Sequence, residues 1–350
     1  MEFKLKKFDM NPVLEPRRRS PWDAAQVRNP AAVMHDGKVH LLYTAAGELE
    51  KDFKMYLGHA VSSDGFNFEF VSDEPVVMPS ETEFDGFDAG SVEDARAVKI
   101  GDTIYVTYVA RSFSHSAFLR GERLKNPPGV GVCWTENYRR GGLMVTKDLK
   151  NFTRMGPVTT DDHYDCNVIL FPEQINGQYV MLHRPSPFKA EIESGAADVA
   201  GMNICFSDDL VNWHDDVVLA KNEHNWETGK IGGACPPVKT AEGWLTLYHA
   251  VEKRPEVCDW YQDHHFCYRT GVMLLDLDDP RKVIARAPYP IMEPETPFEK
   301  FGTVNNVVFV TGVVEMGDEL FLYYGGADTV TCVATTKTKE LLDYVLRYRT

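Results

Sequence analysis

The 350-residue sequence contains no hydrophobic run near the roughly 18 residues that a membrane-spanning helix needs. Its seven cysteines are scattered and include no CxxC pair, so we expect neither a disulfide framework nor a metal site. Basic residues are also scarce, with 37 Lys and Arg against 52 Asp and Glu, for a net charge of −15. Since nucleic acids and anionic membranes attract basic surfaces, this balance excludes both as partners.

The first residues, MEFKLKKFDMNP, lack the apolar core of a signal peptide. Together with the scattered cysteines, this favours a reducing compartment, and we expect a cytoplasmic protein. Hydrophobic residues make up 43% of the chain and charged residues 25%, which is ordinary for a folded protein with a packed core. Composition leaves the oligomeric state open, a homo-oligomer included.

One hairpin pattern recurs five times along the chain. Each copy begins with a turn dipeptide that contains glycine and continues as a strand of alternating aromatic and β-branched residues. The copies lie at 36–45, 101–110, 176–185, 242–251 and 317–326. The sixth residue after each turn is a polar aromatic one: Tyr43, Tyr108, His183, His249 and Tyr324. Such a recurrence indicates five copies of one structural unit.

The repeat predicts an all-β fold, because helical periodicity is almost absent. The copies are 65, 75, 66 and 75 residues apart, enough for a four-stranded blade and a loop each. We therefore expect a five-bladed β-propeller that occupies residues 1–350 as a single domain, although the length alone would allow two or three. The segment 112–139 interrupts the spacing and is predicted to be a long loop. TKTKELLDYVLRY near the C-terminus is predicted to be a short helix.

In a propeller, the ends of the innermost strands converge on a central funnel, so polar residues beside the repeated strands are candidates for chemistry. The acidic and basic residues among these candidates occur in short motifs, which include SVEDARAV, DCNVILFP, MLHRP and GKIGGACPP. Arg184, Lys230 and His249 form a basic set that is suited to holding an anion such as phosphate. Each of these residues also has a plain structural explanation as half of an ion pair or as a core contact.

Five ordered motifs carry a resemblance to a known family: NPAAVMHDGKVHLLYTA, SVEDARAVKIGDTIYVTY, NVILFPEQINGQYVMLHRP, KIGGACPPVKTAEGWLTLYHAV and VVFVTGVVEMGDELFLYYGGADT. From about Asn11 to Tyr344 the chain resembles glycoside hydrolase family 130. The resemblance implies a five-bladed β-propeller and an inverting phosphorylase, which cleaves β-mannosides of manno-oligosaccharides with inorganic phosphate and releases α-mannose 1-phosphate. It implies no cofactor, because phosphate is the co-substrate.

The resemblance also implies roles for individual residues. Asp94 resembles the family's general acid, whose proton travels through a hydroxyl of the bound mannose. The positions that match phosphate-binding residues are Arg184, Lys230, His249 and Asn167. The positions expected to bind the substrate are Glu93, Arg96, Asn306, Tyr324 and Asp328.

Cys166 departs from the family pattern, in which Lys or Arg usually precedes the asparagine of this motif. A neutral thiol does not supply that charge. The alternative function is therefore an inverting β-1,2-mannosidase that uses water in place of phosphate, and such an enzyme needs a second carboxylate as base. The candidate bases are Glu122, Glu136 and Asp162. A third alternative is a propeller that binds glycans without cleaving them.

Overall fold

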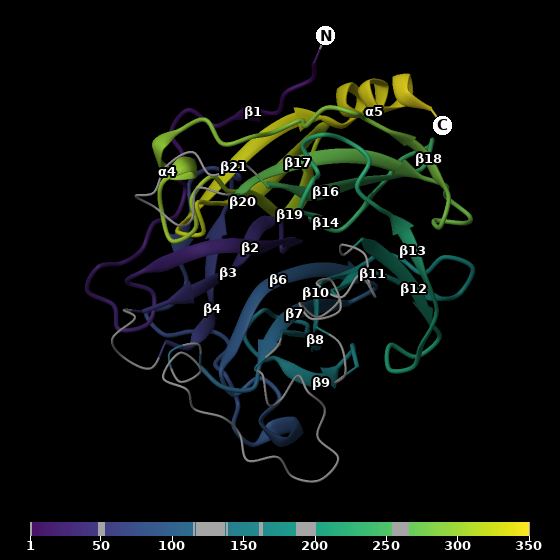
Figure 1. Ribbon diagram of the computed structural model, residues 1–350. Coiled ribbons are helices and arrows are strands. Elements are labelled where there is room, and N and C mark those ends of the chain that lie inside the picture. Colours follow the sequence, from purple (N-terminus) through teal and green to yellow (C-terminus); the bar gives the residue numbers. More distant parts are fainter. Residues whose placement is uncertain are drawn as a thin grey trace.

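The computed structural model describes residues 2–47, 53–114, 116, 137, 139–160, 164–186, 201–253 and 266–349. These residues form a nearly all-β structure, as the repeat predicted (Figure 1). The main helix is α5, Thr338–Val345, at the C-terminal end. Shorter helical turns are α4 at Pro297–Lys300, a 3-10 turn at Glu83–Gly86 and another at Leu346–Tyr348. Among the described residues, no helix combines the length and the apolarity needed to cross a membrane.

The strands group into five antiparallel units that follow one another along the chain. Unit one contains β2 Gln26–His35, β3 Lys38–Ala46, β4 Met55–Ser62 and β5 Glu69–Phe70. Unit two contains β6 Ser91–Ile100, β7 Thr103–Arg111, β8 Arg140–Thr146 and β9 Thr153–Pro157. Only the parallel pair of Met55 with Ser91 joins these two units into one eight-stranded sheet.

The remaining three units are separate sheets. Unit three contains β10 Tyr164–Leu170, β11 Tyr179–Ser186, β12 Met202–Ser207 and β13 Trp213–Ala220. Unit four contains β14 Lys230–Gly233, β15 Val238–Lys239, β16 Trp244–Lys253, β17 Phe266–Leu275 and β18 Val283–Arg286. Unit five contains β19 Val308–Met316, β20 Glu319–Gly326, β21 Val330–Lys337 and the N-terminal strand β1 Lys6–Lys7. The chain's beginning thus completes the sheet formed by its end.

Tight turns set the register of the hairpins at the start of units one and three. In both turns two successive residues have positive φ: Asp36 with Gly37, and Asn176 with Gly177. This is the geometry of a type I′ turn, whose twist matches that of the strands it joins, and it explains the Asp-Gly and Asn-Gly dipeptides.

Two of the repeated aromatics, Tyr43 and Tyr108, share a structural role with Tyr248. The rings of Tyr43, Tyr108 and Tyr248 each lie against a glycine on the next strand, and a Cβ at that glycine would overlap the ring. The glycines are the direct strand partners of the tyrosines: Gly58, Gly142 and Gly271. The ring of each tyrosine occupies the space that a side chain at the glycine would take, and this fit fixes the pairing of the two strands.

The equivalent residue in unit four is therefore Tyr248, whereas the count from the turn predicted His249. The turn of unit four spans residues 240–243, between the paired Lys239 and Trp244, whereas the turns of units one and two span two residues each. The tyrosine of unit four lies one residue earlier than the count predicted. Because successive residues of a strand point to opposite faces, this slip places His249 on the other face of β16 from Tyr248.

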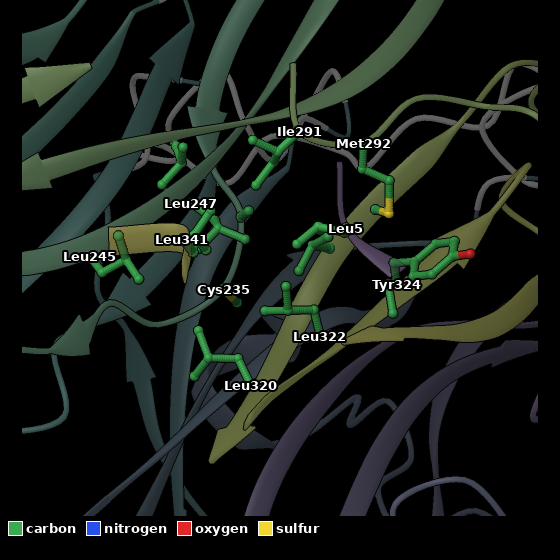
Figure 2. Packing of buried hydrophobic residues seen from close by; sticks show 14 of the residues in the cluster. Leu5, Cys235, Leu245, Leu247, Ile291, Met292, Leu320, Leu322, Tyr324 and Leu341 are labelled. Atoms are coloured by element: carbon green, nitrogen blue, oxygen red, sulfur yellow. The ribbon is translucent and has the colours of Figure 1, made fainter. Parts of the chain in front are cut away.

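The hydrophobic core lies between neighbouring units. Separate clusters of buried residues join units one and two, two and three, three and four, and four and five, and a further cluster joins unit five to unit one. In the cluster between units four and five, Leu245 and Leu247 of β16 face Leu320 and Leu322 of β20, with Leu341 of α5 packed beside them (Figure 2). Each unit is therefore stabilised mainly by its two neighbours.

Candidate active site

A pocket lies where the first strands of several units begin. Seven of the residues predicted to act on a ligand line it: Glu93, Asp94, Asn167, Arg184, Lys230, His249 and Asp328. Cys166, the residue that departs from the family pattern, lines it as well. These residues come from units two, three, four and five, so the prediction that strand ends bring them together is confirmed for this set.

A β-bulge near the start of β2, β6 and β10 accompanies the residues that line the pocket. Asn29, Asp94 and Asn167 all have a positive φ, of 47°, 51° and 59°. At each of them the strand pairing shifts register, which is the mark of a β-bulge. Asn and Asp tolerate the left-handed conformation better than most residues, so the repeated Asn or Asp suits this position.

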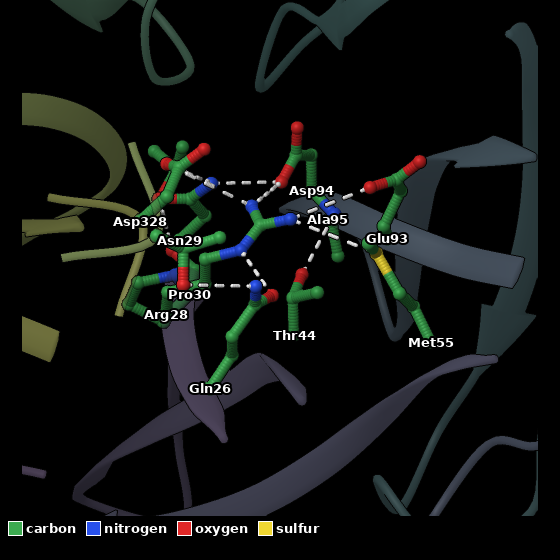
Figure 3. Close-up of polar contacts among 12 residues, drawn as sticks. Gln26, Arg28, Asn29, Pro30, Thr44, Met55, Glu93, Asp94, Ala95 and Asp328 are labelled. Carbon is green, nitrogen blue, oxygen red and sulfur yellow. Dashed lines mark hydrogen bonds and ion pairs between the residues drawn. The ribbon is translucent and has the colours of Figure 1, made fainter. Parts of the chain in front are cut away.

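Arg28 is the centre of a carboxylate cluster on one side of the pocket (Figure 3). Its Nη1 lies 2.8 Å from Asp94 Oδ1 and 3.9 Å from Asp328 Oδ1, and its Nη2 lies 3.4 Å from Glu93 Oε2. Asn29 Nδ2 also donates to Asp94 Oδ1, at 2.9 Å. One buried guanidinium therefore holds three carboxylates in place, as such a planar group with five donors can do.

The two partly exposed carboxyl groups of this cluster have opposite pKa shifts. Burial would raise the pKa of Asp94, but Arg28, Arg96 and the Asn29 amide together hold it below its ordinary value. Burial raises the pKa of Asp328, and the nearby Asp94 charge adds to this effect against the attraction of Arg28. Neighbouring carboxyl groups with diverging pKa values are typical of sites for proton transfer.

A second group of side chains in the same pocket forms a cation cluster. Arg184 is buried, and its Nη1 and Nη2 donate to His249 Nε2 at 3.0 Å and to Cys166 Sγ at 2.7 Å. Lys230 lies with its Nζ 5.5 Å from the centre of the Tyr268 ring. Among the described residues, no carboxylate pairs with the guanidinium of Arg184 or with the ammonium of Lys230. Buried cations without counter-charges are costly, so this part of the pocket is suited to binding an anion.

His249 contacts the cation cluster through Arg184. Burial, with the charges of Arg184 and Lys230, holds the pKa of His249 well below its ordinary value, so the ring is neutral. Its Nδ1 donates to the carbonyl of Gly233 at 3.1 Å, which leaves Nε2 to accept from Arg184. Both ring nitrogens are therefore engaged within the protein, and His249 orients the guanidinium rather than offering a free donor.

Three predicted substrate-binding residues do not line the pocket. Tyr324 belongs to the core between units four and five, and its hydroxyl donates to Glu299 Oε1 at 2.8 Å. Arg96 is buried, where its Nε donates to the Ala234 carbonyl at 2.6 Å and its Nη1 to the Asp94 carbonyl. Asn306 adjoins the pocket-lining Val307, and its own contribution there is a backbone carbonyl that accepts from the Tyr268 amide. None of the three is among the residues that line the pocket, and their contact with the substrate stays a prediction.

The predicted loop at 112–139 and the candidate bases Glu122, Glu136 and Asp162 lie outside the described residues, apart from the loop's ends. The part of the chain that the structure describes contains no group of three or more His, Cys, Asp or Glu placed to hold a metal ion.

Several pocket residues were missed from the sequence: Arg28, Asn29, Arg139, Val304, Val307, Tyr268 and Phe309. A signal for the first two existed, because Arg28 and Asn29 occupy the same place near the start of β2 that Glu93 and Asp94 occupy in β6. Arg139 precedes β8, the third strand of its unit, where the repeat predicts no functional residue.

Lys230 should give the reaction with an anion an alkaline limit. Burial and the charge of Arg184 lower the pKa of Lys230 to about 8, so the side chain is cationic below that pH and neutral above it. We expect kcat/KM for the anion to fall as the pH rises through about 8, because this constant reports ionisations of the free enzyme. In Lys230→Arg the fall should move to higher pH, since arginine stays charged. Identical alkaline limbs in the two proteins would contradict this assignment.

A carboxylate cluster and a cation cluster that line one pocket suit an enzyme that combines proton transfer with the binding of an anion. Comparisons with known proteins agree. The family model described as "beta-1,4-mannooligosaccharide phosphorylase" matches residues 4–347. The chain therefore belongs to glycoside hydrolase family 130, as the motifs indicated, and it is an enzyme.

Individual relatives cover almost the whole chain. A 1,2-β-oligomannan phosphorylase of Thermoanaerobacter sp. (strain X514) is 39% identical over 97% of this chain and 99% of its own length. A β-1,2-mannobiose phosphorylase from the same organism is 35% identical, with the same coverage. The solved structure of β-1,2-mannobiose phosphorylase from Listeria innocua, in complex with β-1,2-mannobiose, is 26% identical, covers 97% of this chain and 99% of its own, and has a TM-score of 0.76.

Proposed function

We propose that this protein is an inverting phosphorylase that cleaves β-mannosidic bonds of manno-oligosaccharides with inorganic phosphate and releases α-mannose 1-phosphate. The observation that carries the proposal is a pair of cations, Arg184 and Lys230, that have no carboxylate partner among the described residues and line the same pocket as Asp94. Phosphate can neutralise such a cluster through charge-assisted hydrogen bonds. The named relatives are phosphorylases, which favours phosphate over water as the nucleophile.

In this mechanism, phosphate bound by Arg184, Lys230 and Asn167 attacks C1 of the mannose from the face opposite the leaving group. A bond from phosphate oxygen to C1 forms as the glycosidic bond from C1 to oxygen breaks, which inverts the configuration. The leaving oxygen receives a proton that originates on Asp94, and Glu93 and Asp328 bind the mannose ring. Since phosphate supplies the nucleophile, no general base and no cofactor is needed.

The ionised state of Asp94 in the free protein fits this sequence of events. A general acid must be protonated when the bond breaks, and Arg28 opposes protonation. A phosphate anion in the pocket adds negative charge near Asp94, and a nearby like charge raises the pKa of a carboxyl group. Phosphate binding therefore favours the protonated form of Asp94 that the reaction needs, and it also places the nucleophile in the pocket.

The linkage that fits the comparisons best is β-1,2. The two Thermoanaerobacter relatives, at 39% and 35% identity, are both named for β-1,2-mannosides. The description of the family model names β-1,4-linked substrates instead, so the family spans both linkages. The greater similarity to the β-1,2-acting enzymes supports the β-1,2 assignment.

The experiment compares substrates and co-substrates in one assay. Purified protein is incubated with β-1,2-mannobiose or β-1,4-mannobiose, with and without phosphate, and mannose 1-phosphate is quantified by chromatography. We expect mannose 1-phosphate from the β-1,2-linked sugar only when phosphate is present, and a much lower rate with the β-1,4-linked sugar. Free mannose formed at equal rates without phosphate would indicate the hydrolase alternative, and a faster β-1,4 reaction would overturn the linkage.

The five units are best explained as the blades of a β-propeller. Each unit shares a hydrophobic core with the next, and unit five shares one with unit one. Strand β1 pairs with β21 at the outer edge of unit five, so the two ends of the chain meet in one sheet. Both features support a circular arrangement, in which one domain accounts for residues 1–350.

A cytoplasmic location agrees with the state of the cysteines. The five that the structure describes are buried free thiols: Cys166, Cys205, Cys235, Cys267 and Cys332. Free thiols persist most readily in a reducing compartment. The release of a sugar phosphate also suits a compartment in which phosphate is at hand.

A further inference from the structure

The cation cluster receives a third positive charge from a residue that the repeat did not predict. Arg184 comes from unit three and Lys230 from unit four, while Arg139 reaches the same pocket from the start of β8 in unit two. Between them lies Cys166, whose neutral thiol brings no charge. Arg139 therefore either forms a structural ion pair with a neighbouring carboxylate or binds the anion.

The backbone of Arg139 is fixed beside Cys166. Its carbonyl oxygen accepts from the amide of Asp165 at 3.0 Å, which ties the residue to the start of β10. The guanidinium Nη1 donates to the hydroxyl of Tyr164 at 2.8 Å, and the group lies 5.8 Å from the centre of that ring. These contacts hold the side chain at the pocket, where 35% of it stays exposed.

Among the described residues, Arg139 has no close carboxylate of its own. The nearest in this set, Glu93 Oε1, lies 3.9 Å from Arg139 Nε, too far for a hydrogen bond, and this Nε has no hydrogen-bond partner within the same set. Glu93 is already bound more closely by Arg111, at 3.1 Å, and its other oxygen faces Arg28 at 3.4 Å. The charge of Glu93 is thus shared among three arginines and does not neutralise Arg139.

We propose that Arg139 is a further phosphate-binding residue, which supplies to the anion the positive charge that Cys166 does not. This inference rests on the proposed function. A guanidinium with donors left over can bind a phosphate through two parallel hydrogen bonds, a geometry that a lysine or a thiol does not offer. Together, Arg139, Arg184 and Lys230 surround the anion from three units.

The test is the Michaelis constant for phosphate in Arg139→Gln. Loss of one charge-assisted contact should raise KM for phosphate by about 10- to 100-fold. The KM for the mannoside should stay within about threefold of the wild-type value, because the sugar is bound at the Arg28 side. Arg139→Lys should give an intermediate KM for phosphate. Arg349→Gln is a control that removes the same charge from an exposed ion pair with Glu242 and should change neither constant.

The outcomes separate three cases. An unchanged KM for phosphate in folded Arg139→Gln overturns the inference, and so does an equal rise of both constants, which a structural role through Glu93 would cause. If the wild-type protein itself needs no phosphate, the proposed function fails instead. If circular dichroism shows that Arg139→Gln does not fold, phosphate titration of Arg139→Lys by thermal shift decides, since a shift equal to that of the wild type contradicts the proposal.

Discussion

Asp94→Asn should lose phosphorolysis by about a hundred- to ten-thousandfold in kcat, the contribution typical of a general acid. The amide has the size of the carboxyl group and keeps an oxygen that can accept from Arg28 and Asn29, so the pocket should keep its shape. It has no acidic proton to give, however, and the leaving oxygen would depart as an alkoxide. The rate of mannose 1-phosphate release at saturating substrate measures the effect.

Phosphate binding provides the contrast for this variant. Since we assign phosphate to the cation cluster and not to Asp94, Asp94→Asn should bind phosphate at least as tightly as the wild type, measured by calorimetry. Asp36→Asn, in an exposed turn where asparagine suits the positive φ, is the matched control and should retain full activity. Retention of more than a tenth of wild-type kcat by Asp94→Asn would show that the proton comes from another group.

Glu227→Ala should lower the free energy of unfolding by about 3–5 kcal/mol, the usual result of removing one partner of a buried ion pair. Glu227 is fully buried, and both its oxygens accept from Arg286 Nη2, at 2.9 and 2.8 Å. Oε1 also accepts from the Tyr248 hydroxyl at 2.8 Å. The variant would leave a buried guanidinium without its main counter-charge in the unit that supplies Lys230. Equilibrium unfolding in urea measures the loss.

The comparison for this variant is an exposed pair in the same unit. Glu242 lies 3.3 Å from Arg349 with about half of its side chain exposed, so Glu242→Ala should cost less than about 1 kcal/mol. Equal losses in the two variants would mean that the buried network does not stabilise unit four.

Much of the fold was predictable because a repeated strand leaves a strong signal. Alternating hydrophobic residues after a Gly-containing turn specify a hairpin through local chemistry, and five copies indicate one unit used five times. It was harder to predict which residues of two copies occupy equivalent positions. In unit four the equivalent residue is Tyr248 and not His249, and the pairing of Tyr248 with Gly271 shows this where the count from the turn does not.

The candidate site was predictable where it follows the repeat. Glu93, Asp94 and Asn167 lie at bulges in the first strands, and strand beginnings converge. Tyr324 lies in the core between units four and five and not in the pocket lining. Alternation in the sequence shows that the two faces of a strand differ, but it does not show which face lines the pocket. Arg139 could not be predicted, because its approach to Cys166 depends on how units two and three pack together.

The central claim is that phosphate in the cation cluster is the nucleophile. Proton and phosphorus NMR during the first turnovers of β-1,2-mannobiose in phosphate buffer test it most directly, because they identify the first product and its anomeric configuration together. The account predicts that α-mannose 1-phosphate is the first mannosyl product and that none of the disaccharide is consumed when phosphate is omitted. Free mannose as the first product, or β-mannose 1-phosphate, would contradict it.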